Sequence, residues 1–162
     1  MTKGKSQIKE QELIMNYDVV TLEEKKILGV SARTGNARPD MQSVIGGLWQ
    51  DYYGKGLNVS IKNKVSEHAY GIYSDYDADT YQVTVGAEVS RFENDGGLAE
   101  VVIPAGKYAH FHVFGDQVTA VANAWAEIWK TELKRTFTAD FEEYVAFDGV
   151  NATVEIYVAI EG

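Results

Sequence analysis

The chain has 162 residues, 45% of them hydrophobic, and contains no cysteine. This length and apolar content are typical of one domain with one core, and the lack of cysteine excludes disulfides, thiolate metal sites and a cysteine nucleophile. A formal net charge of −9 at pH 7 repels phosphate backbones, so we expect no direct binding to nucleic acid.

The sequence also predicts the compartment. No segment approaches the roughly 20 consecutive apolar residues of a membrane span, and the N-terminus has no apolar stretch long enough for a signal peptide. Without cysteine, an extracellular protein would have no covalent support. We therefore expect a cytoplasmic protein that does not interact with membranes.

The first part of the chain predicts an arm, a strand and a helix. Residues 1–16 are polar without strong periodicity and are expected to form a flexible arm, so that the domain covers 17–162. Residues 17–31 predict an extended or bulged strand, because the middle of this run is polar. A helix is predicted over 39–53, where apolar residues recur every three or four positions before a Gly-Lys-Gly stop.

The middle of the chain predicts a hairpin and a kinked strand. Residues 69–73 and 81–89 are rich in β-formers and are joined by a turn-rich stretch. The runs 98–103 and 107–113 predict another strand, kinked between them at Pro104-Ala105-Gly106.

The last third repeats the order of the first. Asp116 is a candidate cap for a helix that extends to about Arg135 and has one broad apolar face. Two strands, 140–147 and 151–160, follow it, and the Asp-Gly pair between them is typical of a tight hairpin.

This order predicts an α+β fold built from two β-α-β-β halves. The match between the halves indicates an internal duplication, because Leu48-Trp49 corresponds to Ile128-Trp129 in the two helices and the hairpins also correspond. Two such halves can pair about a pseudo-dyad into an antiparallel sheet, with the two helices flanking a cleft. That cleft is the natural place for a ligand.

Metal chemistry has little support. Of the three histidines, only His110 and His112 have related spacing, since residues two apart on a strand point to the same face, whereas His68 lies elsewhere. No ligand-rich helix, glycine-rich phosphate loop or nucleophile elbow accompanies them. We expect neither a metal site nor a cofactor.

Acidic residues next to aromatic ones are the stronger candidates. Alternation along 141–145 places Glu142 with Tyr144 on one face and Glu143 on the other. A carboxylate in an aromatic pocket attracts cationic or polar ligands and can act as a general base, whereas the alternative is a solvated glutamate on a half-exposed strand. Glu88, in the apolar run 83–89, has the same two interpretations.

Three tryptophans complete the candidate list. Trp125 and Trp129 lie one helical turn apart, and Trp49 occupies the matching place in the first helix. Either these rings belong to the core, or at least one of them reaches the cleft between the helices.

Four segments in chain order resemble the GyrI-like family, also called the AraC-type or bacterial effector-binding domain. They are residues 70–76 (YGIYSDY), 85–89 (VGAEV), 103–109 (IPAGKYA) followed by Gly115, and 140–144 (DFEEY). The resemblance covers about residues 17–161 and implies a two-repeat fold with a central cleft. It also implies that Glu142 is the cleft carboxylate, with Tyr144 beside it.

The resemblance also suggests functions. Many members of that family are fused to DNA-binding regions, which this chain does not show, so it looks like the stand-alone branch. That branch includes a subfamily of cyclopropanoid cyclopropyl hydrolases, which open the strained ring of DNA-alkylating compounds within an aromatic cage. The candidate cage residues here are Trp49, Tyr70, Trp125, Trp129, Tyr144 and Tyr157, and Glu88 is a further candidate ligand contact.

Three functions therefore remain open. In the first, the protein is a cofactor-free hydrolase of flat electrophilic xenobiotics that gives resistance to them, and Glu142 orients the attacking water. In the second, it binds small molecules without changing them, as a sensor or sequestering protein. In the third, its acidic surface binds a protein partner, as in gyrase-inhibitor-like proteins.

Overall fold

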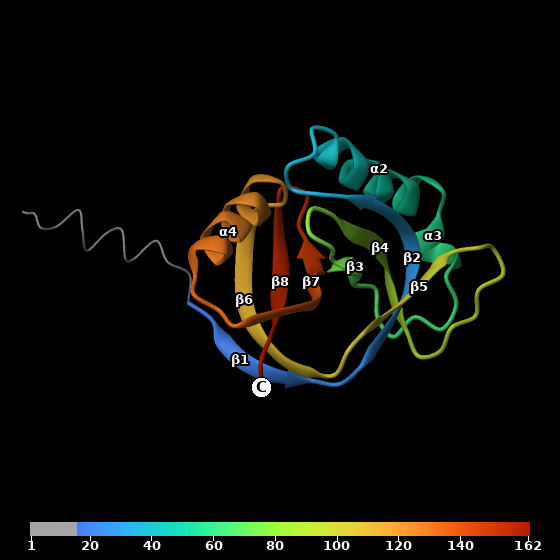
Figure 1. The fold of residues 1–162 in the computed structure, drawn as a ribbon. Helices are drawn as coiled ribbons and strands as arrows, with labels where there is room; N and C mark the ends of the chain where they lie inside the picture. Colours follow the sequence, from blue (N-terminus) through green and yellow to red (C-terminus); the bar gives the residue numbers. More distant parts are fainter. Residues whose placement is uncertain (1–15) are drawn as a thin grey trace, which may run out of the picture.

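The computed structural model describes residues 16–162 and contains one sheet of eight strands with three helices (Figure 1). The predicted arm therefore lies outside the described residues, apart from Asn16. In chain order the elements are β1 (Asp18–Leu22), β2 (Lys25–Thr34), α2 (Met41–Gly54), α3 (Leu57–Ser60), β3 (Ala69–Ser74), β4 (Tyr81–Val89), β5 (Ala99–Ile103), β6 (Gly106–Asp116), α4 (Thr119–Lys130), β7 (Arg135–Phe147) and β8 (Asn151–Ile160).

The predicted α+β fold with two similar halves is confirmed. The strand order β1-β6-β8-β7-β3-β4-β2-β5 is symmetric about the central pair β7 and β3, and every neighbouring pair is antiparallel. Each half starts with a long strand that bends and crosses to the other half. As a result β1 pairs with β6, and β5 pairs with β2.

The bends occur where the sequence predicts them. Pro104, which has no N–H for the sheet ladder, separates β5 from β6. In the first half the acidic pair Glu23-Glu24 separates β1 from β2. Strand β2 also lies close to β4, where Gly29 and Gly86 face each other. A Cβ at Gly29 would lie 1.9 Å from the carbonyl oxygen of Val85, so only glycine fits there.

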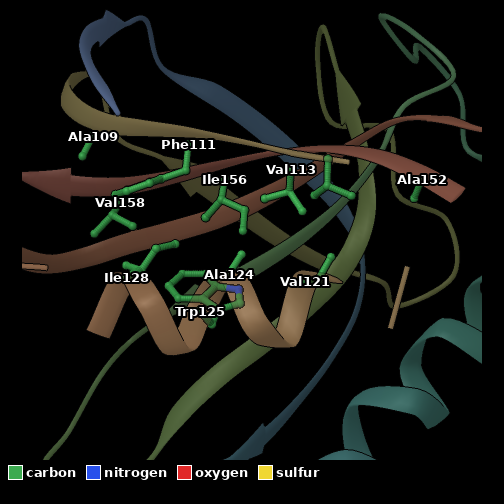
Figure 2. Packing of buried hydrophobic residues seen from close by; sticks show 11 residues of the cluster. Ala109, Phe111, Val113, Val121, Ala124, Trp125, Ile128, Ala152, Ile156 and Val158 are labelled. Atoms are coloured by element: carbon green, nitrogen blue, oxygen red, sulfur yellow. The ribbon is translucent and has the colours of Figure 1, made fainter. Parts of the chain in front are cut away.

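Helices α2 and α4 lie over opposite halves of the sheet (Figure 1). Helix α4 packs Val121, Ala124 and Ile128 onto β6 and β8, as Figure 2 shows. Helix α2 packs Leu48 and Tyr52 onto the corresponding strands β2 and β4. Among the described residues, no helix combines the length and apolarity needed to cross a membrane.

Helix α4 is shorter than predicted. Asp116 does accept hydrogen bonds from the backbone N–H groups of Val118 and Thr119, at 3.2 and 2.8 Å, but α4 ends at Lys130. Thr131 has an extended backbone, and Arg135 already belongs to β7. Leu133, whose spacing suggested a longer helix, does pack against the core, but it does so from the segment that connects α4 to β7.

Candidate functional site

The most unusual buried group on the helix face of the sheet is the carboxylate of Glu142. It lies on β7 at the centre of the sheet, directly opposite Gly71 of β3, and is 3% exposed. An ionised carboxylate is costly to bury unless its surroundings supply charge or hydrogen bonds.

Three neutral donors surround this carboxylate. Trp125 of α4 donates its indole N–H to Oε2 at 2.7 Å, and Tyr73 of β3 donates its hydroxyl to the same oxygen at 2.9 Å. Tyr144, two residues along β7, donates to Oε1 at 2.7 Å. Elements from both halves thus meet at one acidic group, and none of these partners carries a positive charge.

Burial and the hydrogen bonds act on the pKa of Glu142 in opposite directions. Burial raises the pKa of Glu142 above its ordinary value, while the hydrogen bonds from Tyr144, Trp125 and Tyr73 act to lower it. Burial and the nearby carboxylate hold the pKa of Tyr73 and that of Tyr144 well above 10, so both phenols remain hydrogen-bond donors at neutral pH.

Aromatic rings enclose the carboxylate. Trp49 of α2 meets Tyr144 edge-on, with ring centroids 4.9 Å apart, and stacks loosely on Tyr53 at 6.2 Å. On the other side Trp125 packs against Tyr73 at 5.6 Å and Trp129 at 6.4 Å. The rings therefore form two walls, one attached to each long helix.

The floor between the walls is Gly71. A Cβ at this position would lie 3.3 Å from Oε1 of Glu142 and 3.5 Å from the ring of Trp49. Glycine therefore leaves just enough room for the carboxylate and the indole to approach each other.

A second buried carboxylate on the same face gives a useful contrast. Asp140 is fully buried, and Arg135 donates to its Oδ2 at 2.6 Å. The hydroxyl of Tyr76 and the backbone N–H of Ala159 also donate to this carboxylate. Asp140 thus has a cationic partner within the protein, whereas the described partners of Glu142 are all neutral.

The structure brings five of the predicted site residues together and separates the other three. The group around the central carboxylate consists of Glu142, Trp49, Trp125, Trp129 and Tyr144. Trp129 lies at its rim and is 55% exposed.

Tyr70, Glu88 and Tyr157 lie apart from this group, because their side chains are on the opposite face of the sheet. Tyr70 donates to Glu88 at 3.1 Å, and Tyr157 stacks on Phe141 with centroids 4.7 Å apart. Successive side chains on a strand point to opposite faces, so residues that pair with Phe141 or Glu143 face away from the aromatic site.

Sequence reasoning missed Tyr73, Gly71 and the Asp140–Arg135 pair. Tyr73 and Gly71 are two residues apart on β3 and so share a face, but only the register with β7 shows that this is the face of Glu142. Arg135 was assigned to the end of a helix and not to a strand.

The three histidines all contact carboxylates on the opposite face. His68 lies 2.6 Å from Glu143, while His110 and His112 lie 2.5 and 2.7 Å from Glu155. Within residues 16–162, no three or more histidine, aspartate and glutamate side chains are arranged to hold a metal ion.

The side chain of Glu142 has almost no exposed surface. Two hollows on the protein surface lie elsewhere, and their lining does not include Glu142. One, of about 430 Å³, lies beside β1, and the other, of about 250 Å³, lies between β6 and α4.

Comparisons with known proteins agree with this architecture. No curated protein matches the chain. The integron cassette protein VCH_CASS2, from the mobile metagenome of Vibrio cholerae, is 26% identical with a TM-score of 0.72, and the match covers 90% of this chain and 95% of that one.

Two more distant structures share the fold. SAV2435, solved with bound tetraphenylphosphonium, is 18% identical with a TM-score of 0.75 over 91% of this chain and 95% of that one. The C-terminal domain of EcmrR is 18% identical with a TM-score of 0.61 over 91% and 98%. The family model Cass2, described as integron-associated effector binding protein, matches residues 18–160, and the chain therefore belongs to this effector-binding family.

Proposed function

We propose that this protein binds flat or lipophilic organic cations between α2 and α4, with Glu142 as the counter-charge. The observation that carries this proposal is the difference between the two buried carboxylates. Asp140 is neutralised by Arg135, but Glu142 receives only hydrogen bonds from neutral groups. A cationic ligand would supply the missing charge and recover part of the cost of burying the carboxylate.

The walls suit such a ligand. A cation over the face of a tryptophan or tyrosine ring is attracted by the negative face of the π-system, most strongly where water is excluded. Trp49 and Trp125 come from different halves and flank the carboxylate, so a ligand between them would contact both long helices. This arrangement favours aromatic or lipophilic cations over small hydrated ions.

Binding in this proposal requires opening of the aromatic walls. Tyr53 and Trp129 are more than half exposed and pack against Trp49 and Trp125 respectively. Both outer rings can rotate into solvent without unpacking the sheet. We infer that the ligand takes the space these rings vacate and uses the Gly71 floor.

Hydrolysis of an electrophilic xenobiotic is the second candidate, and the raised pKa of Glu142 supports it. A buried carboxylate of raised pKa is suited to general-base catalysis, here the positioning of water for attack on a cyclopropyl carbon. Against this role, the carboxylate already accepts three hydrogen bonds, two on Oε2 and one on Oε1, so a catalytic water would compete with these donors for the remaining acceptor position.

One pair of measurements separates the two candidates. Titration with tetraphenylphosphonium, followed by tryptophan fluorescence, should show saturable binding with one ligand per chain. Mass spectrometry of a spirocyclopropyl alkylating compound incubated with the protein then tests turnover. Unchanged compound would leave a binding protein, a product heavier by one water at many turnovers would show a hydrolase, and the absence of saturable cation binding would refute the first proposal.

A further inference from the structure

Glu142 lies in the central strand pair, where the two halves of the fold meet. In the register of β3 and β7 it faces Gly71, and Tyr73 and Tyr144 each follow one member of this pair by two residues. Because the strands are antiparallel, the two tyrosines lie on opposite sides of the pair and on the same face of the sheet. The carboxylate accepts a hydrogen bond from each of them, at 2.9 and 2.7 Å. It is therefore placed midway between the halves.

A row of three aromatic rings leads outward on each side of this carboxylate. Each row begins with the strand tyrosine that donates to Glu142, continues with a tryptophan of a long helix, and ends with a ring that is more than half exposed. Neighbouring ring centroids within the rows are 4.9 to 6.4 Å apart. The α2 row is Tyr144, Trp49 and Tyr53, and the α4 row is Tyr73, Trp125 and Trp129.

The two rows are alike in chemistry, but the charge they share is a single one. The three side-chain hydrogen bonds that the described structure shows for these rings all end on Glu142. The position opposite it, which is equivalent in the other half, is Gly71 and carries no side chain. The site therefore has one carboxylate at its middle and aromatic surface on two sides of it.

We propose that this site selects cations that carry their positive charge near the middle of the molecule, with an aromatic group on either side. When the charge lies over Glu142, each aromatic group lies along one row. A cation with its charge at one end either covers a single row or holds its charge away from the carboxylate. This inference rests on the proposed function, because it assumes that cations bind beside Glu142.

Either compromise weakens binding of an end-charged cation. Doubling the distance between the ligand's charge and the carboxylate halves their attraction. Leaving one row uncovered removes a stacked ring pair and the apolar area it buries, which corresponds to about tenfold or more in affinity. The position of the charge should therefore matter even between ligands of equal size and equal charge.

Two isomeric ammonium ions test the position of the charge. Dibenzyldimethylammonium has its quaternary nitrogen between two phenyl rings, whereas (biphenyl-4-ylmethyl)trimethylammonium has the same atoms and charge with the nitrogen at one end. Each is titrated into the full chain, with tryptophan fluorescence as the signal. The central isomer should have a dissociation constant about tenfold or more below that of the terminal isomer.

The variant Glu142→Gln shows whether the preference comes from the carboxylate. Without the charge, the terminal isomer can cover both rows at no electrostatic cost. The ratio of the two dissociation constants should therefore fall to less than about twofold.

The indole N–H signals of Trp49 and Trp125 in the NMR spectrum report on the two rows separately. At saturation the central isomer should shift both signals, because one phenyl ring lies against each row. The terminal isomer, with its charge at Glu142, should shift one of them much more than the other.

The possible failures of the inference and of the proposed function can be told apart. Equal affinities of the two isomers, tighter binding of the terminal one, a preference that survives in Glu142→Gln, or a central isomer that shifts only one indole signal would overturn the inference and leave a cation site. Binding of tetraphenylphosphonium without binding of the central isomer would do the same. If none of the three cations binds, the proposed function is refuted and the inference with it.

Discussion

Replacing Glu142 with glutamine removes one negative charge from the aromatic site and keeps the shape of the side chain. The amide oxygen can still accept the hydrogen bond from Trp125, and the NH₂ group can donate to the hydroxyl oxygen of Tyr144. For a cation held about 5 Å from the carboxylate, an effective dielectric constant of about 20 gives an attraction of about 3 kcal/mol. We therefore expect the substitution to weaken binding of a cation by about 100-fold.

The assay compares a cation with a neutral compound of similar shape. Tetraphenylphosphonium and triphenylphosphine oxide are titrated into both proteins, and quenching of tryptophan fluorescence reports occupancy next to Trp49 and Trp125. The cation should lose about 100-fold in affinity, and the neutral compound should change by less than about threefold. Equal losses for both compounds, or no loss for the cation, would refute the electrostatic argument.

The wild-type protein, unlike the glutamine variant, has a predictable pH dependence at this site. Burial raises the pKa of Glu142 above 4.5, so between pH 4.5 and the raised value the folded chain keeps a proton that the unfolded chain releases. The folded state therefore loses stability as the pH rises through this window. Thermal melts should show equal stability of wild type and glutamine variant below the window, and a more stable variant above it. Cation binding should strengthen over the same pH rise, because the carboxylate forms.

Three other substitutions test the surroundings of the site. Gly71→Ala should cost about 1 kcal/mol of stability and weaken ligand binding, since its Cβ would press on the carboxylate and on one wall; unchanged affinity would show that the floor is not used. Trp125→Phe removes a hydrogen bond that lowers the pKa of Glu142, so the pH profile of cation binding should move to higher pH; an unmoved profile would contradict the assigned hydrogen bond. Arg135→Met leaves Asp140 buried without a cation and should lower the free energy of unfolding, measured with denaturant, by about 3–5 kcal/mol. The control Arg33→Met, at an exposed ion pair, should lower it by less than about 1 kcal/mol, and similar losses in both variants would contradict the prediction.

Much of the fold follows from local pattern. The two helices, the hairpins and the kink at Pro104 are visible in the sequence because periodicity, turn residues and the missing N–H of proline act over a few residues. The duplication is visible for the same reason, since equivalent elements recur in the same order. Alternation within one strand likewise groups Glu142 with Tyr144 and separates both from Glu143.

Tertiary structure alone decided which face each strand turns to the helices. Alternation along one strand divides its side chains between two faces of the sheet. Only the pairing register with the neighbouring strand decides which residues of the two strands share a face, and shifting that register by one residue moves every side chain of a strand to the other face. That is why the sequence did not separate Tyr70 and Tyr157 from the face of Glu142 and did not place Tyr73 and Gly71 on it. The sequence by itself determined the elements and the central acid, whereas the long-range pairing of β3 with β7 determined its neighbours, because those contacts join residues about 70 positions apart.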